Sequence, residues 1–207
     1  MNRAISPGSP EPVRSPQMER RRRILDATIS LASEGGYDAV QMRVVAHRAE
    51  VALGTLYRYF PSKVHLLVAA LAREFERTAE QLHRRPFPGR SRAERVGYVL
   101  RGTTQVLEDD PRLTEALTRA FMLADASMAA QVAVVETQVS QLLVGAMSDP
   151  ADAADPPEDD PADEDVAIAK VIGDVWLAGL VQWVSGRATV EDVQSSMATA
   201  VGLLLRD

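Results

Sequence analysis

The spacing of apolar residues is the feature that most constrains the fold of this chain. In one segment after another, apolar side chains recur every three or four residues, the spacing that buries one face of an α-helix. Helix stops and starts, such as Gly35-Gly36 and Asp110-Pro111, separate these segments. We find no convincing segment with the alternating pattern of a β-strand. The 207-residue sequence therefore predicts an all-α protein.

The predicted helices fall into two groups. Three helices and a long fourth one come first, and Pro86–Gly89 ends the fourth. Segment 166–184 is apolar almost all round, which predicts that the domain core covers one side and another subunit the other. The predicted helical segments are about 20–33, 42–49, 52–60, 62–82, 93–107, 110–124, 128–147, 166–184 and 190–205.

Two stretches are expected to lack regular structure. Residues 1–17 contain four prolines among polar residues, and residues 149–165 contain nine acidic residues and four prolines. Neither stretch can bury enough apolar surface to offset the entropy lost on ordering. We therefore expect a disordered tail and a flexible acidic loop. Met18 directly precedes the first helical pattern, so the sequence leaves open whether translation starts at Met1 or Met18.

Composition excludes several classes of chemistry. The chain has no cysteine, and its three histidines (His47, His65 and His83) all lie in the first 83 residues. This excludes thiolate catalysis anywhere and a Ser–His pair within the later part of the chain. We expect no metal and no cofactor. The sequence has no run of 18 apolar residues and no signal peptide, which predicts a cytoplasmic protein without a membrane partner.

Charge is distributed unevenly along the chain. Residues 1–86 carry 14 Lys and Arg against 9 Asp and Glu, whereas residues 87–207 carry 9 against 20. The local balances are +5 and −11, which together give the net charge of −6. Because phosphate binding depends on local charge, the first part is a candidate for contact with a nucleic acid. Chance fluctuation of surface charge is the alternative explanation.

Segments 42–49 and 52–60 form a candidate helix-turn-helix. Two short helices joined by a tight turn, with a longer helix on each side, are typical of this DNA-binding motif. Val51, Leu56 and Phe60 would pack inward, and the other side would face phosphates and base edges. Lys63, in the first turn of the next helix, is expected to clamp a phosphate. The predicted DNA-binding residues are Arg43, Leu53, Gly54, Thr55, Tyr57, Arg58, Tyr59 and Lys63.

The run Gly54–Lys63 (GTLYRYFPSK), preceded by Ile24–Ala27 and Gly36-Tyr37, resembles the N-terminal domain of TetR-type transcriptional repressors. The similarity covers about residues 20–68. It implies a homodimer on a palindromic operator. It further implies that residues 18–66 bind DNA and that residues 67–207 bind an effector. The last two helices, 166–184 and 190–205, would form the dimer.

Three positions depart from the usual TetR-type pattern. Gln41 stands where Thr usually caps the second helix, Glu50 where Gly usually forms the turn, and Ala52 where Ser usually precedes the recognition helix. A cap or a left-handed turn position is worth about 1 kcal/mol. We therefore expect the motif to form but to be locally softer.

In the later half, Leu113–Phe121 and Val171–Leu177 resemble a group of actinobacterial TetR-type repressors of cholesterol catabolism. The resemblance implies control of steroid-catabolism genes and an effector that is a CoA thioester of a sterol metabolite. The alternative is a TetR-type repressor of another acyl-CoA or hydrophobic molecule. Large apolar residues of a helical bundle are mostly core, so we expect only a few to line a cavity. The candidate effector-binding residues are Leu100, Phe121, Met122, Met128, Trp176 and Trp183, with Arg119 for a CoA phosphate.

Two other classes of protein are alternatives to a regulator. An acyl-CoA-acting enzyme would need a nucleophile and a base in the cavity, and the absence of His and Cys after residue 83 argues against it. A helical scaffold without DNA binding would leave Thr55, Tyr57, Arg58 and Lys63 unexplained. We therefore expect a regulator that is not an enzyme.

Overall fold

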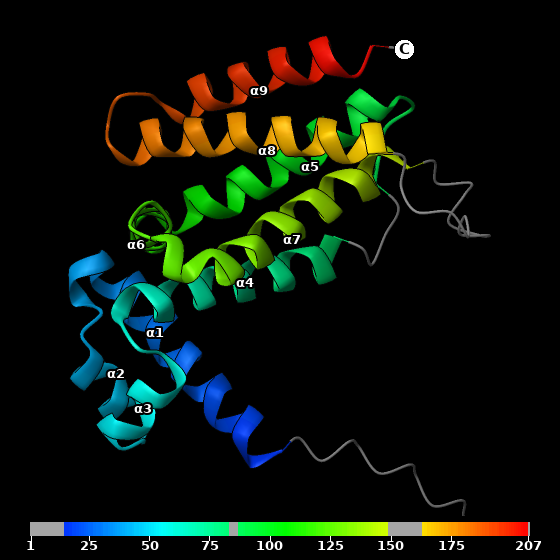
Figure 1. The fold of residues 1–207 in the computed structure, drawn as a ribbon. Helices are drawn as coiled ribbons and strands as arrows, with labels where there is room; N and C mark the ends of the chain where they lie inside the picture. The colour runs from blue at the N-terminus through cyan, green and yellow to red at the C-terminus, as the bar shows by residue number, and fades with distance from the viewer. Residues whose placement is uncertain (1–14, 83–86, 149–162, 207) are drawn as a thin grey trace, which may run out of the picture.

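The computed structural model describes residues 15–82, 87–148 and 163–206, and every regular element in these ranges is helical (Figure 1). The predicted all-α fold is therefore confirmed. The elements are α1 (Pro16–Ala39), α2 (Met42–Arg48), α3 (Leu53–Tyr59), α4 (Lys63–Leu82), α5 (Arg92–Asp109), α6 (Pro111–Met122), the 3₁₀ helix η1 (Ala126–Met128), α7 (Ala129–Met147), α8 (Asp163–Val184) and α9 (Val190–Leu204).

Two helices begin earlier than the sequence predicts. α1 begins at Pro16 because the Ser15 hydroxyl accepts a hydrogen bond from the Met18 amide (3.3 Å) and proline suits the first helical turn. α8 begins at Asp163. The acidic residues of its first turn stabilise the helix, because negative charge interacts favourably with the N-terminal end of the helix dipole. Residues 16–17 and 163–165 thus belong to helices. The rest of the predicted tail and acidic loop, residues 1–14 and 149–162, lies outside the described residues.

The regular part of α1 ends at the predicted glycine pair. Gly35 and Gly36 have non-helical backbone angles, and φ of Gly36 is 68°, in the left-handed region that favours glycine. One further short turn carries the chain to Ala39. The end of α1 therefore changes direction where the sequence places the helix stop.

The helices form a body with the helix-turn-helix at one end. In Figure 1, α2 and α3 lie at the bottom, α8 and α9 lie at the top, and α4 to α7 lie between them. One apolar cluster joins α1, α2 and α3 to α4 and α6, and it includes Leu56 and Leu117. A second cluster joins α5, α7, α8 and α9 around Trp176. Because the first cluster continues into α6, packing does not stop at the expected domain boundary at residue 66.

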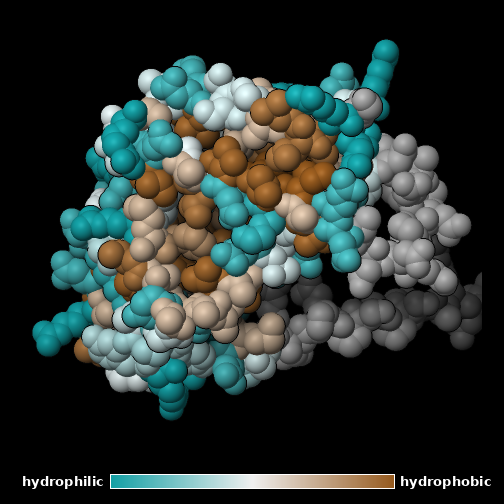
Figure 2. Space-filling model, turned by 45° about the horizontal axis from the view of Figure 1, so that its top comes forward, coloured by the Kyte–Doolittle hydropathy of each residue, from teal (hydrophilic) through white to brown (hydrophobic). Residues whose placement is uncertain are grey.

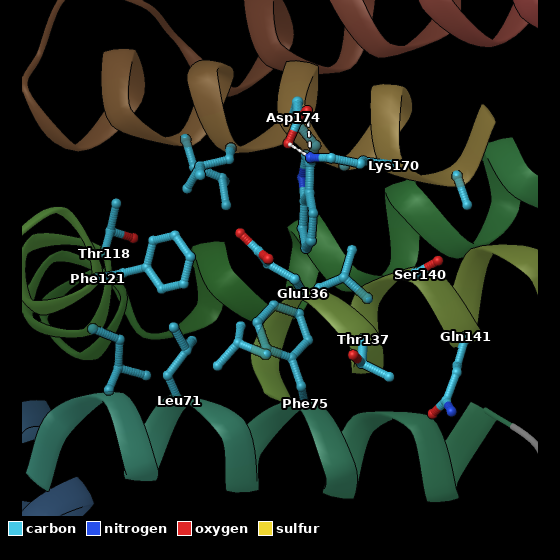
Figure 3. Close-up of a pocket in the computed structure, with 18 of the residues that line it drawn as sticks. Leu71, Phe75, Thr118, Phe121, Glu136, Thr137, Ser140, Gln141, Lys170 and Asp174 are labelled. Carbon is cyan, nitrogen blue, oxygen red and sulfur yellow. Dashed lines mark hydrogen bonds and ion pairs between the residues drawn. The ribbon is translucent and has the colours of Figure 1, made fainter. Parts of the chain in front are cut away.

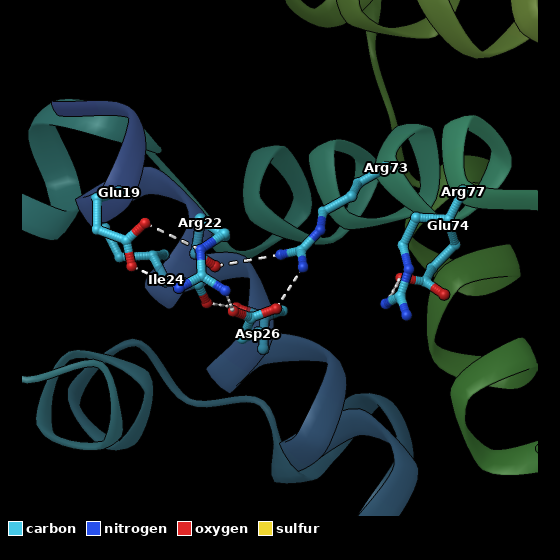
Figure 4. A network of polar contacts seen from close by, with 8 residues as sticks. Glu19, Arg22, Ile24, Asp26, Arg73, Glu74 and Arg77 are labelled. Carbon is cyan, nitrogen blue, oxygen red and sulfur yellow. Dashed lines mark hydrogen bonds and ion pairs between the residues drawn. The ribbon is translucent and has the colours of Figure 1, made fainter. Parts of the chain in front are cut away.

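A polar network also holds α1 against α4 (Figure 4). Arg73 of α4 donates a hydrogen bond to the backbone carbonyl of Arg22 (3.1 Å) and forms an ion pair with Asp26. The Arg22 guanidinium lies 3.6 Å from the same carboxylate. The helix that follows the helix-turn-helix is thereby tied to the helix that precedes it.

α8 has one face covered by this chain and one face exposed. It is long and apolar enough to cross a bilayer by length and composition alone, a property that core helices of helical proteins share. Gly179 lets α9 approach closely, because a Cβ at this position would lie 3.1 Å from Val193. Val171 and Ala178 are exposed, on the face of α8 opposite to its buried residues. The buried residues of α8 are Ala169, Ile172, Trp176 and Leu180.

Candidate DNA-binding surface and effector cavity

α2 and α3 form the helix-turn-helix that the sequence predicts. Leu56 and Phe60 are buried and Val51 is partly buried, as expected for the inward side of α3. In the turn between the helices, Glu50 adopts a left-handed conformation with φ of 54°. The N-cap residues Gln41 and Ala52 make no side-chain capping hydrogen bond. All three departures therefore lie where glycine or a capping hydroxyl would stabilise the motif.

The outer side of α3 presents a polar and basic surface. Gly54, Tyr57 and Arg58 are exposed, and Thr55 is half-buried. Arg43 of α2 is exposed as well. These side chains are accessible to phosphates and base edges. By contrast, the predicted contact residues Leu53 and Tyr59 are partly buried and pack against the first apolar cluster.

Lys63, the expected phosphate clamp, contacts an aromatic ring in this structure. Its Nζ lies 3.7 Å from the centroid of the Tyr37 ring. Arg119 of α6 lies over the same ring, with its Cζ 4.5 Å from the centroid. Desolvation by burial lowers the pKa of the Lys63 ammonium. In this structure Lys63 thus links the start of α4 to the end of α1.

The end of α1 is held against α6 by contacts that we call the α1–α6 junction. Glu115 accepts a hydrogen bond from the backbone N–H of Tyr37 (3.1 Å) and forms an ion pair with Arg119 (3.6 Å). A Cβ at Gly36 would lie 3.1 Å from the Glu115 carboxylate, so glycine leaves room for this contact. The junction consists of Glu34, Gly36, Tyr37, Arg112, Glu115 and Arg119, with Arg112 donating to the Glu34 carbonyl at 2.6 Å.

A cavity of about 630 Å³ lies between α4, α6, α7 and α8 (Figure 3). Its volume is within the range of small-molecule sites. Lining residues on α8 run from Val166 to Leu180, about 21 Å along the helix axis. The cavity is therefore elongated. Its apolar lining includes Leu71, Phe75, Leu107, Leu117, Phe121, Val135, Val139, Val144, Val166, Ala169, Trp176, Leu177 and Leu180.

Polar side chains gather on the side of the cavity between α7 and α8. Glu136, Thr137 and Gln141 of α7 are exposed. Lys170 and Asp174 of α8 form an exposed ion pair (3.1 Å), which Figure 3 shows beside the cavity. This exposed polar side is the opening to solvent. Among the described lining residues Lys170 is the only cation, so it is the lining group that can pair with a phosphate.

The structure brings two of the seven predicted effector-binding residues, Phe121 and Trp176, into this cavity. The other five lie elsewhere. Leu100 lines a separate pocket of about 350 Å³ between α5 and α9, Met122 is exposed, Met128 is buried in the first apolar cluster, Trp183 packs against the second, and Arg119 belongs to the α1–α6 junction.

Sequence reasoning missed the polar residues of the cavity and the role of Tyr37. A signal for the opening was present, because Lys170 and Asp174 belong, with Gln182, to the one polar line of a mainly apolar segment. Nothing in the sequence distinguishes Thr118, which lines the cavity, from other helical threonines. The contact of Tyr37 with two cations depends on how three helices pack.

Comparison with known proteins agrees with this architecture. Residues 24–70 match the model for bacterial regulatory proteins of the tetR family, and residues 89–204 match that for the tetracyclin repressor-like C-terminal domain. The HTH-type transcriptional repressor KstR of Rhodococcus jostii is 53% identical over 191 residues, which cover 92% of this chain and 85% of that protein.

Solved structures share the fold. A TetR transcriptional regulator from Rhodococcus sp. RHA1 is 31% identical, with a TM-score of 0.81, over 93% of this chain and 98% of that one. Thermus thermophilus FadR in complex with lauroyl-CoA is 18% identical, with a TM-score of 0.67, over 89% of this chain and 93% of that one. The chain therefore belongs to the TetR family of bacterial transcriptional regulators, and it is a homologue of KstR repressors.

Proposed function

We propose that this protein represses steroid-catabolism genes by binding a palindromic operator as a homodimer, and that a CoA thioester of a sterol metabolite releases it. The observation that carries the proposal is the elongated, mainly apolar cavity bounded by α4 and α6. Both helices also pack against the DNA-binding helices in one apolar cluster. A ligand that fits only one arrangement of α4 and α6 therefore biases the position of α3.

For DNA binding, we propose residues 18–66 as the DNA-binding unit and α3 as the recognition helix. Tyr57 and Arg58 are exposed residues of α3, which lies at the end of the molecule remote from α8 and α9 (Figure 1). Arginine can contact phosphate or a guanine edge, and the tyrosine hydroxyl can bond phosphate. In the proposed complex Lys63 supports α4 through the Tyr37 ring and contributes positive charge near the DNA backbone.

We propose that the dimer forms through the exposed faces of α8 and α9. Val171 of α8 is 46% exposed and Leu203 of α9 is 58% exposed. Ala178 and Gly202 on these helices are also exposed, and small side chains allow another helix to approach closely. Figure 2 turns this end of the molecule forward and displays apolar residues gathered among polar ones. A two-fold dimer would hold two α3 helices at the spacing of successive major grooves, about 34 Å.

The chemistry of the cavity supports an effector with a large apolar body and an anionic end. The lining is mainly apolar along about 21 Å of α8, and Lys170 stands at the opening. Lys170 can exchange its exposed partner Asp174 for a phosphate. The same fold holds lauroyl-CoA in Thermus thermophilus FadR, so another acyl-CoA is the second candidate effector.

Partly filling the cavity tests this assignment. A Cβ at Gly173 would lie 3.4 Å from Val139 of α7, and the rest of a leucine side chain would enter the cavity between the two helices. We expect Gly173→Leu to bind operator as the wild type does but to need at least about ten-fold more thioester for release, equivalent to about 1.4 kcal/mol.

The matched control is Gly102→Leu on α5, where a Cβ would meet open space. The operator is first obtained by selection from random DNA, and we expect an inverted repeat. Equal release of Gly173→Leu and wild type would contradict the assigned cavity. Selection of a single, unrepeated site would contradict the dimer.

A further inference from the structure

Thr118 differs from the other buried threonines in its hydrogen bonding. It is 7% exposed, and in the described part of the chain its hydroxyl has no hydrogen-bond partner. Helical threonines often donate to the carbonyl four residues earlier. The Thr118 oxygen is not among the fully buried unpaired atoms of the described residues, which are Arg92 Nε and Gln138 Oε1, so it is open to the cavity that Thr118 lines. The other four are paired: Thr28 donates to the Ile24 carbonyl (2.8 Å), Thr103 to that of Val99 (2.8 Å), Thr114 to that of Leu107 (2.7 Å), and Thr104 accepts from Trp176 Nε1 (3.2 Å).

The unpaired hydroxyl lies at the inner end of the effector cavity. Thr118 lines the cavity on α6, next to Phe121. Figure 3 shows its oxygen on the cavity side, at the end opposite to Ser140 and Gln141. Apolar side chains such as Leu71 and Leu117 form the surrounding wall. Thr114, one turn earlier on α6, also lines the cavity, but its hydroxyl already donates to the Leu107 carbonyl. Among the described residues at this end, Thr118 is therefore the one whose hydroxyl is free to pair with a ligand.

We infer that Thr118 is a specificity-determining residue that hydrogen-bonds an oxygen carried on the buried end of the effector. The inference rests on the proposed function and names the chemistry of that effector more closely. A threonine hydroxyl both donates and accepts, so it can pair with a ketone or a hydroxyl. The group recognised is thus an oxygen remote from the thioester.

This geometry distinguishes two classes of acyl-CoA. A saturated fatty acyl chain ends in a methyl group and would leave the Thr118 hydroxyl unpaired. A sterol carries its oxygen on the ring farthest from the side chain on which the thioester forms. With CoA at the opening near Lys170, that ring oxygen would reach the Thr118 end of the elongated cavity. A site that hydrogen-bonds a ligand oxygen discriminates against the analogue that lacks it.

Thr118→Val tests the inference because valine keeps the shape and removes the hydroxyl. The probes are a sterol side-chain CoA thioester with a ring ketone and the matched thioester without the ring oxygen, with affinities measured by calorimetry on the full-length dimer. We expect the wild type to prefer the ketone by about ten-fold and Thr118→Val to lose this preference. Thr118→Ser should retain it. Thr137→Val, which removes an exposed hydroxyl from the same cavity, should also retain it.

The outcomes separate this inference from the proposed function. If Thr118→Val lowers the affinity for both thioesters by the same factor, or for neither, Thr118 does not hydrogen-bond the ring oxygen and the inference is overturned. If neither thioester binds the wild type, the proposed sterol effector fails and the inference fails with it. Thermal unfolding of each variant, compared with the wild type, verifies that a lost preference does not come from a misfolded α6.

Discussion

The ammonium of Lys63 lies 3.7 Å from the centroid of the Tyr37 ring, so the first residue of α4 contacts the end of α1. Arg119 of α6 lies over the same ring. α4 and α6 both line the effector cavity, and α1 packs with the helix-turn-helix. One aromatic ring thus contacts two of the helices that line the cavity, which makes Tyr37 a physical link between the cavity and the helix-turn-helix end.

Tyr37→Leu should weaken this link. Leucine keeps apolar volume but loses both cation–π contacts, each worth about 0.5–2 kcal/mol. We expect the effector to bind the free dimer as before, whereas its coupling to operator release falls by about 2- to 30-fold. The measurement is effector affinity with and without operator. Tyr98→Leu on α5, where the tyrosine residue is 42% exposed, is the control. Unchanged coupling in Tyr37→Leu would show that the signal takes another route.

Glu50→Gly should stabilise the protein. Glu50 has φ of 54°, where a side chain is strained and glycine is not. The exposed ion pair of Glu50 with Arg23 (3.5 Å) contributes little, so its loss should not offset the gain. We expect the free energy of unfolding to rise by about 0.5–1 kcal/mol in denaturant titrations. Glu50→Ala removes the same carboxylate and keeps the strain. Equal stabilisation by both variants would assign the effect to charge instead.

Arg58→Ala should weaken operator binding without dissociating the dimer. Arg58 is exposed on α3, far from α8 and α9, and a lost phosphate or base contact costs about 1–3 kcal/mol. If Arg58 contacts phosphate, the slope of log affinity against log salt should also fall by about 0.9 per subunit. Arg77→Ala, on α4 and paired with Glu74, is the control. Wild-type affinity in Arg58→Ala would exclude α3 as the recognition helix.

The capping box of α9 should add a pH dependence to stability. Hydrogen bonds from the backbone and hydroxyl of Thr189 lower the pKa of Asp192 below its usual 3.8. A carboxyl whose pKa is lower in the folded state stabilises the fold above the unfolded pKa, and this contribution is lost as the pH falls through the folded pKa. The difference in unfolding free energy between wild type and Asp192→Asn should therefore shrink below about pH 3.8. A difference that stays constant there would contradict the cap.

The helix-turn-helix was the most predictable part of the fold. Helical spacing alone placed Leu56 and Phe60 inward, and both are buried. The resemblance to TetR-type sequences singled out Glu50, because glycine usually occupies this turn position, and Glu50 does adopt a left-handed conformation. These features depend on local sequence, so sequence reasoning reaches them.

The cavity was much less predictable, because it depends on the space left between four helices. Met128 and Phe121 are both large apolar residues near the same turn, yet Met128 is buried in the core and Phe121 lines the cavity. Likewise, α1 begins inside the predicted tail, at Pro16, because the Ser15 hydroxyl accepts a hydrogen bond from the Met18 amide. Helical periodicity indicates which face of a helix is apolar, and tertiary packing decides whether a residue on that face contacts protein or lines a cavity.

The most direct test of the proposed function is a titration of the operator-bound dimer, monitored by fluorescence anisotropy of labelled operator. The titrants are a sterol side-chain CoA thioester, the corresponding free sterol acid, lauroyl-CoA and free CoA. We expect the sterol thioester to release the operator at the lowest concentration. A ligand shifts the dimer from its operator-binding arrangement to its released arrangement only if it binds the second more tightly than the first. Release by lauroyl-CoA alone would make the protein a fatty acyl-CoA regulator, and release by free CoA alone, or by none of the four, would contradict the sterol effector.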